Sequence, residues 1–186
     1  MCDPRPGRPR GDSDRGQHPY RGRGFGDRRA TVASRGGEVG SGKTVAARAA
    51  VSLLEPSRHS VIYLPNPSIG ARGLYGEIVG RLGGVPRFHK AALIPQVTSL
   101  LAAEVAERGR RVVLVVDEAH LLDPAQLEEL RLLTNAEMDS TSPFALVLLG
   151  QLALRSRLRL GTFAALDQRI TLRYAIPPMS AEECSS

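Results

Sequence analysis

The stretch that decides the fold is GEVGSGKT, residues 37–44. It matches the pattern G-x-x-x-x-G-K-[ST], which is typical of a loop that wraps around a phosphate chain. Glycine permits the backbone angles that turn successive N–H groups inward around phosphate oxygens. A helix that begins at about Lys43 points its positive end at the same anion. The pattern therefore predicts a site for a nucleoside triphosphate, with a ligand-free Gly-rich turn as the alternative.

The end of the motif carries the side chains with predicted roles. Lys43 is expected to reach the β- and γ-phosphates, and Thr44 to offer its hydroxyl to Mg²⁺. The residues predicted to bind the nucleotide here are Gly37, Glu38, Val39, Gly40, Ser41, Gly42, Lys43 and Thr44.

A second motif is RVVLVVDEAHLL, residues 111–122. Asp117 and Glu118 follow an aliphatic run that reads as a strand buried on both faces, and the carboxyl ends of such strands are where open α/β sheets bind ligands. Asp117 is expected to hold the metal through water. Glu118 is expected to polarise the attacking water as a general base. An acidic pair at a strand end can also be a helix cap, but the phosphate-loop motif in the same chain favours the catalytic interpretation.

Two further polar residues are candidates for catalysis. Gln151 follows FALVLLG, residues 144–150, on the predicted neighbouring strand, where it could touch the γ-phosphate or orient water. A capping or loop glutamine is the alternative. Arg169 is the candidate for an arginine that reaches a neighbouring subunit's nucleotide and stabilises the charge in transfer. The other arginines that compete for this role are Arg155, Arg157, Arg159 and Arg173.

Strands and helices alternate along the chain after residue 37. Strands are predicted at 60–65, 111–118, 144–151 and 169–176, and helices at 44–54, 72–83 and 94–109. Pro95 is expected near the start of the third helix and Gly109 after its end. Asp123 is expected to cap a helix that begins at Pro124, with Gln126 completing a capping box. Near-continuous aliphatic strands separated by helices predict an α/β fold with a parallel sheet covered on both faces.

The charge of the chain is concentrated at its start. Residues 1–36 carry nine Arg and four Asp, a balance of +5, out of a total of +6. The remainder is therefore nearly neutral, and the overall charge does not by itself indicate a nucleic-acid-binding domain. The segment 1–36 has almost no periodic apolar pattern and is predicted to be disordered. An Arg-Gly arm for nucleic acid is the alternative, because RGRGFG places an aromatic ring among cations.

The composition also bears on location. No stretch approaches the roughly 20 apolar residues that a membrane span needs, and no charged-then-apolar leader opens the sequence. Cys2 and Cys184 stand at opposite ends, which indicates neither a disulfide framework nor a metal site. A cytoplasmic location is expected.

Taken in order, six stretches resemble those of bacterial AAA+ ATPases of the ORC1/DEAH class: GEVGSGKT, VIYLPNP, VVLVVDEAHLLD, LEELRLLTNAEMDS, LLGQ and FAALDQRI. The closest resemblance is to ExeA-like proteins and to the TniB- and MuB-type ATP-binding helpers encoded beside transposases. It covers about residues 37–183. It implies a P-loop NTPase (AAA+) fold with a five-stranded parallel sheet in the order 5-1-4-3-2, ATP as the nucleotide, and homo-oligomers.

The resemblance also implies a role for each motif. Lys43 and Thr44 correspond to Walker A, and Asp117 and Glu118 to Walker B. Gln151 corresponds to sensor 1. Arg169 corresponds to the arginine finger.

The sequence departs from that family at both ends. The family has a helix and an aliphatic strand before Walker A, whereas RGFGDRRATVASRG stands here and only residues 31–33 look strand-like. This first strand is poorly supported, and we hypothesise that residues 1–36 are read out of frame. SAEE, residues 180–183, is a capping box that should open the family's helical lid, yet only residues 184–186 follow. The expected organisation is thus an incomplete ATPase core at 37–183 and the truncated start of a lid at 184–186.

The leading functional hypothesis is an ATP-binding and ATP-hydrolysing domain of a transposition helper, a type that binds DNA and recruits or activates a transposase. Two alternatives are an ExeA-like secretion ATPase and a non-catalytic nucleotide-binding remnant. A DEAH helicase is disfavoured, because it needs two ATPase-like lobes and only 68 residues follow Glu118.

Overall fold

Among the described residues, the core is a three-stranded parallel sheet. The computed structural model describes residues 43–134 and 144–173. The strands β1 (His59–Leu64), β2 (Arg111–Val116) and β3 (Phe144–Leu148) lie in the order β1-β2-β3. All are parallel, with Val113 of β2 opposite Val61 on one side and Ala145 on the other. This order corresponds to the 4-3-2 part, three of the five strands, of the arrangement that the resemblance implies. The predicted strand before residue 37 lies outside the described residues.

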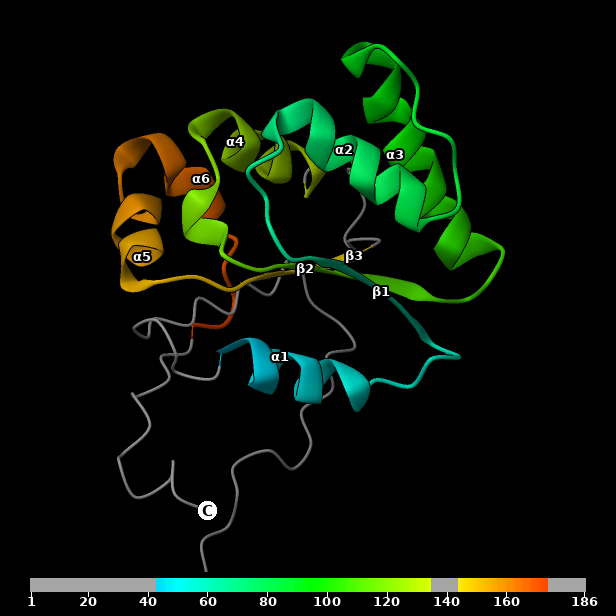
Figure 1. The fold of residues 1–186 in the computed structure, drawn as a ribbon, viewed down its shortest axis with the longest axis horizontal. Helices are drawn as coiled ribbons and strands as arrows, with labels where there is room; N and C mark the ends of the chain where they lie inside the picture. The colour runs from blue at the N-terminus through cyan, green and yellow to red at the C-terminus, as the bar shows by residue number, and fades with distance from the viewer. Residues whose placement is uncertain (1–42, 135–143, 174–186) are drawn as a thin grey trace, which may run out of the picture.

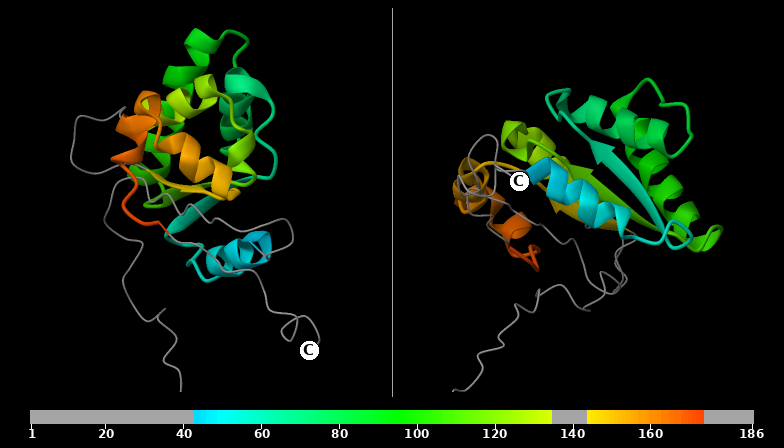
Figure 2. Two further views of the ribbon diagram at one scale, coloured as in Figure 1. Left: turned by 90° about the vertical axis from the view of Figure 1, so that its left-hand side faces the viewer. Right: turned by 60° about the horizontal axis from the view of Figure 1, so that its bottom comes forward.

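Helices cover both faces of this sheet. They are α1 (Lys43–Ser52), α2 (Gly70–Arg81), α3 (Lys90–Ala106), α4 (Pro124–Leu133), α5 (Leu152–Leu158) and α6 (Ala164–Asp167), with short 3₁₀ turns at Ala119–Leu121 and Gly161–Phe163. Figure 1 shows α1 on one side of the sheet and α2, α3 and α4 on the other, and the turned views agree (Figure 2). The predicted α/β class and the two-sided covering are confirmed. None of the described helices is long and apolar enough to cross a membrane.

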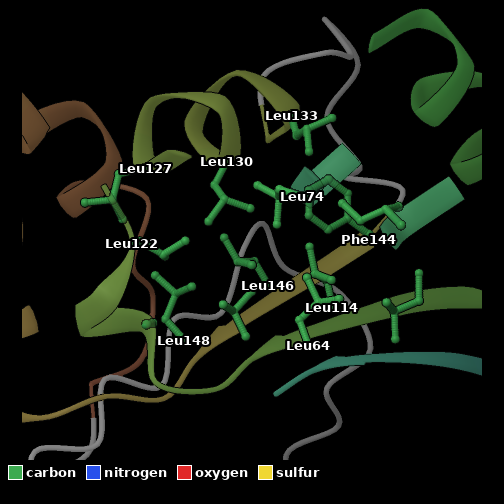
Figure 3. Close-up of a cluster of buried hydrophobic side chains, with 14 of the residues drawn as sticks. Leu64, Leu74, Leu114, Leu122, Leu127, Leu130, Leu133, Phe144, Leu146 and Leu148 are labelled. Atoms are coloured by element: carbon green, nitrogen blue, oxygen red, sulfur yellow. The ribbon is translucent and has the colours of Figure 1, made fainter. Parts of the chain in front are cut away.

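Successive residues of β2 pack into different apolar clusters. Val112, Leu114 and Val116 join the larger cluster with α2, α3 and α4, part of which is drawn in Figure 3. Val113 and Val115 join a smaller cluster with Ala47 of α1. This alternation follows from the two-residue period of a strand. Because both faces are covered, β2 reads as an unbroken aliphatic run rather than as alternating polar and apolar residues.

The ends of two helices test the predicted signals. Asp123 accepts from the Gln126 N–H at 2.7 Å and Gln126 accepts from the Asp123 N–H at 3.0 Å, which confirms the capping box. Gly109 follows α3 with φ 61°, which a non-glycine residue rarely adopts. However, α3 begins at Lys90, so Pro95 lies in its second turn rather than near its start. Proline leaves the Ala91 carbonyl without a helical partner, and both residues are exposed, so water can satisfy it.

The predicted strand at 169–176 does not begin at residue 169, although Arg173 forms an isolated β-bridge. The Arg169 N–H donates to the Leu166 carbonyl at 3.0 Å and the Ile170 N–H to the Asp167 carbonyl at 3.2 Å, so these residues form turns that follow α6. The apolar alternation there reflects burial of Ile170 under the helices and not a strand from residue 169. Residues 174–176 lie outside the described residues, as do the tail 1–36 and the expected lid start at 184–186.

Candidate functional site

The site is built where the first helix meets the carboxyl end of the central strand. Thr44, in the first turn of α1, donates its hydroxyl hydrogen to Oδ2 of Asp117 at 2.8 Å, across 73 residues of sequence. Asp117 directly follows β2, and its own N–H donates to the Leu64 carbonyl at the end of β1. The backbone ladder therefore fixes the carboxylate at the sheet edge where α/β folds bind ligands. The sequence predicts these two side chains in one site, and they are in contact.

Tyr63 also belongs to the site, although no motif in the sequence predicts it. Its hydroxyl donates to the same Oδ2 atom of Asp117 at 2.5 Å, and the guanidinium of Arg48 lies 5.5 Å from the centre of its ring. The pKa of the Tyr63 hydroxyl is raised above its ordinary value. Burial is the larger cause, and the hydrogen bond to Asp117 is the second. The available signal was position, because Tyr63 is the penultimate residue of β1 and faces the same side as α1.

Glu118 has an unusual backbone. Its φ of 49° and ψ of 35° place it in the left-handed region, which costs an L-residue about 1 kcal/mol. The bend is held by the Glu118 N–H, which donates to Oδ1 of Asp117 at 2.8 Å, and by the Ala119 N–H, which donates to the Leu149 carbonyl at 2.7 Å. The Glu118 side chain is 41% exposed and lies 3.3 Å from Nδ1 of His120. It can therefore meet a solvent molecule, as a general base must.

Arg157 holds the segment after Glu118 and was considered in the sequence only as a competitor for Arg169. From α5, its two terminal nitrogens donate to the carbonyls of His120 and Leu122, each at 2.7 Å. Such a fork fixes two backbone groups at once. The position of α5 is thus tied to the loop that carries Glu118.

Gln151 stands where β3 ends beside this loop. A Cβ on the preceding Gly150 would lie 3.2 Å from the backbone nitrogen of His120, so the two segments are in close contact. Gln151 is half-buried at the N-cap position of α5, and its side chain makes no capping hydrogen bond. The capping alternative is therefore not seen, and a catalytic role stays a prediction.

The other candidate arginines, in and after α5 and α6, have different contacts. Arg169 donates to the Thr134 hydroxyl at 3.1 Å, at the end of α4. Arg173 pairs with Asp167 at 2.9 Å, whereas Arg155 and Arg159 are exposed. A role for Arg169 toward a neighbouring subunit stays a prediction.

The side chains fit a hydrated Mg²⁺ beside a nucleotide. The Thr44 hydroxyl directs its hydrogen to Asp117, so its lone pairs remain for a cation. The part of the chain that the structure describes has no cluster of three His, Cys, Asp or Glu residues able to hold a metal ion. Magnesium ordinarily takes one or two protein oxygens and completes its shell with water and phosphate oxygens. Lys43 is the first residue of α1, and Gly37–Gly42 lie outside the described residues.

A second polar cluster lies inside the helical layer. The Tyr75 hydroxyl donates to Oε2 of Glu129 at 2.5 Å, and Lys90 pairs with the other carboxylate oxygen. The pKa of Tyr75 is raised far above its ordinary value. Burial is the larger cause, and the hydrogen bond to Glu129 is the second. Tyr75 is fully buried, which makes this cluster a structural link between α2, α3 and α4.

The fold and the motifs define a P-loop NTPase of the AAA+ class. A family model described as an AAA domain matches residues 29–158, and the chain belongs to that family. Membership implies nucleotide binding together with a divalent metal.

The chain is also similar to individual known proteins. It is 39% identical over 150 residues to General secretion pathway protein A of Aeromonas hydrophila, a match that covers 79% of the chain and 27% of that relative. It is also similar to Cdc6p of Pyrobaculum aerophilum, with 26% identity, a TM-score of 0.56, and coverage of 83% and 40%. The ORC2 protein of Aeropyrum pernix, in its ADPNP–ADP complexes, shares the fold with a TM-score of 0.64 at 20% identity over 83% and 43%. The chain therefore spans less than half of each of these proteins.

Proposed function

We propose that the chain is an Mg²⁺-dependent ATPase domain that binds ATP at residues 37–44 and hydrolyses it beside Asp117 and Glu118. The observation that carries the proposal is the hydrogen bond between Thr44 and Asp117, which joins the end of the glycine-rich motif to the acidic strand end. The same two residues supply oxygens of the kind that Mg²⁺ prefers.

Each residue then has a defined task. Backbone amides of Gly37–Gly42 and the amino end of α1 bind the phosphates, and Lys43 pairs with the β- and γ-phosphates. Thr44 and Asp117 hold the cation, which when bound neutralises charge on the phosphate oxygens.

Glu118 removes a proton from the attacking water. Gln151 orients that water or contacts the γ-phosphate, and Arg169 acts toward the nucleotide of a neighbouring copy in an ATP-dependent homo-oligomer.

Three variants test this assignment through ATP binding and phosphate release. Lys43→Ala is expected to abolish ATP binding, because it removes the cation that pairs with the phosphates. Glu118→Gln is expected to bind ATP normally and to release no phosphate, because an amide cannot accept the proton. Lys90→Ala changes the other lysine of the chain and should bind ATP like the wild type. Unchanged ATP affinity in Lys43→Ala would overturn the proposal. Binding without phosphate release in the wild type would indicate the non-catalytic remnant.

Two roles in a larger assembly are candidates. The 39% identity to General secretion pathway protein A favours an ExeA-like secretion ATPase. The order of the motifs also supports a transposition helper that binds DNA and a transposase. Phosphate release measured with and without double-stranded DNA separates the two. Stimulation by DNA supports the helper role, and DNA-independent turnover supports the secretion role.

A further inference from the structure

One oxygen of Asp117 carries both hydroxyl contacts of the site. Thr44 and Tyr63 each donate to Oδ2, at 2.8 and 2.5 Å, while Oδ1 accepts from the Glu118 N–H at 2.8 Å. Asp117 is only 4% exposed, so protein donors largely set the orientation of its carboxylate. The two oxygens of this carboxylate are therefore not equivalent.

The two oxygens of Asp117 also differ in how many acceptor positions remain free for a further hydrogen bond. An ionised carboxylate has about four lone-pair positions, two on each oxygen. The two hydroxyls fill those of Oδ2. Among the described residues, Oδ1 accepts only from Glu118, which leaves it one further position. A water molecule of the hydrated cation can then bind Asp117 through Oδ1 and in one orientation.

We propose that Tyr63 is a positioning residue that selects the oxygen with which Asp117 meets the hydrated Mg²⁺. The inference rests on the proposed function, because it concerns the same site. Without the Tyr63 hydroxyl, Oδ2 regains an acceptor position and the carboxylate loses one of its three restraints. The water that bridges Asp117 to the metal then has two competing positions.

The ring of Tyr63 is also contacted by α1, the helix that follows the glycine-rich motif. Arg48 lies one helical turn after Thr44 on α1, and its guanidinium stacks on the ring at 5.5 Å from the centre. Thr44 and Arg48 thus contact Asp117 and Tyr63 from the same face of one helix. The threonine hydroxyl on Asp117 and the cation on the Tyr63 ring therefore both come from α1.

The test is the Mg²⁺ dependence of nucleotide binding by the full chain. Binding of methylanthraniloyl-labelled ATP is measured by fluorescence, first in EDTA and then across a Mg²⁺ titration. In Tyr63→Phe we expect unchanged affinity in EDTA and an about 3- to 10-fold higher Mg²⁺ concentration for half-maximal enhancement, the size of one lost hydrogen bond. Arg48→Ala, which keeps the hydroxyl but frees the ring, should shift the curve in the same direction by less.

Tyr75→Phe is the matched control, because it removes the same hydroxyl-to-carboxylate bond outside the site. Its Mg²⁺ curve should superimpose on that of the wild type. A Tyr63→Phe curve that also superimposes would overturn the positioning role alone. Absence of any Mg²⁺ dependence in the wild type would overturn the proposed function and the positioning role together. Circular dichroism establishes that each variant is folded before the comparison.

Discussion

Two tyrosine–carboxylate pairs in this protein have the same hydrogen-bond length and the same spacing in sequence. Tyr63 donates to Asp117 and Tyr75 to Glu129, each at 2.5 Å and each across 54 residues. The spacing is equal because Tyr75 follows Tyr63 by twelve positions and Glu129 follows Asp117 by twelve positions. β1 packs beside β2, and α2 packs beside α4. Sequence spacing and bond length therefore do not distinguish the two pairs.

Their other partners do distinguish them. Glu129 receives Tyr75 on one oxygen and Lys90 on the other, and all three residues belong to helices of a single layer. Asp117 stands at the end of the central strand, and Thr44 reaches it from the opposite face of the sheet. The first carboxylate stabilises the packing of helices. Asp117, in contrast, lies at the sheet edge between α1 on one face and the helices α2, α3 and α4 on the other. It stands beside the motif that predicts phosphate binding.

The sharpest way to break this comparison is to neutralise Asp117. Asp117→Asn keeps an oxygen that accepts from Thr44 and Tyr63 but loses the charge that attracts a cation. ATP turnover is expected to fall by about 100- to 1000-fold, with a change in the free energy of unfolding below about 1 kcal/mol. Phosphate release and urea unfolding provide the two numbers. Large destabilisation with normal turnover per folded molecule would make Asp117 a structural residue like Glu129.

Glu129→Ala should show the opposite pattern. The buried Tyr75 hydroxyl would lose its acceptor and a cavity would remain, so the free energy of unfolding should fall by about 2–4 kcal/mol. Glu129→Gln, which keeps an acceptor, should lose about 1 kcal/mol. ATP binding by the folded fraction should be unchanged in both variants. A selective loss of ATP binding by folded Glu129→Ala would contradict the structural role.

A smaller effect is expected at Arg157, which connects the Asp117 site to α5. Arg157→Ala removes a charged donor from two carbonyls and should lower the free energy of unfolding by about 1–2 kcal/mol, while slowing turnover through movement of Glu118. Arg159→Ala, an exposed arginine of the same segment, should change stability by less than about 0.5 kcal/mol. Equal unfolding curves for the two variants would show that the fork does not restrain the loop.

The smallest expected effect is the contribution of the Tyr75–Glu129 pair to the pH dependence of the free energy of unfolding. Because the native pKa of Tyr75 is raised above 10.0, the unfolded chain ionises this residue first. Its contribution is fully present below pH 10 and is lost as the pH rises further, by about 1.4 kcal/mol per pH unit. Tyr75→Phe should therefore reduce the alkaline loss of unfolding free energy by this slope. Urea unfolding between pH 9 and 11 measures it, and identical slopes in the two proteins would refute the pairing.

Much of the fold could be predicted because its signals are local. The capping box of Asp123 and Gln126 needs only four residues, and the doubly buried β2 needs only its aliphatic run. The turns at 169–170 were missed because apolar alternation also arises when single residues are buried beneath helices. The early start of α3 was missed because a proline in the second turn is tolerated where solvent meets the backbone.

For the site, the sequence by itself determined that a glycine-rich motif and an acidic strand end meet, because parallel strands bring their carboxyl ends to one edge. Only the tertiary structure decided that Tyr63 shares an oxygen of Asp117 with Thr44 and that Arg157 holds the loop beyond Glu118. These partners are 35 to 73 residues apart. Local propensity and periodicity carry no information about such contacts, which arise only when packing of the layers fixes the distance between the side chains.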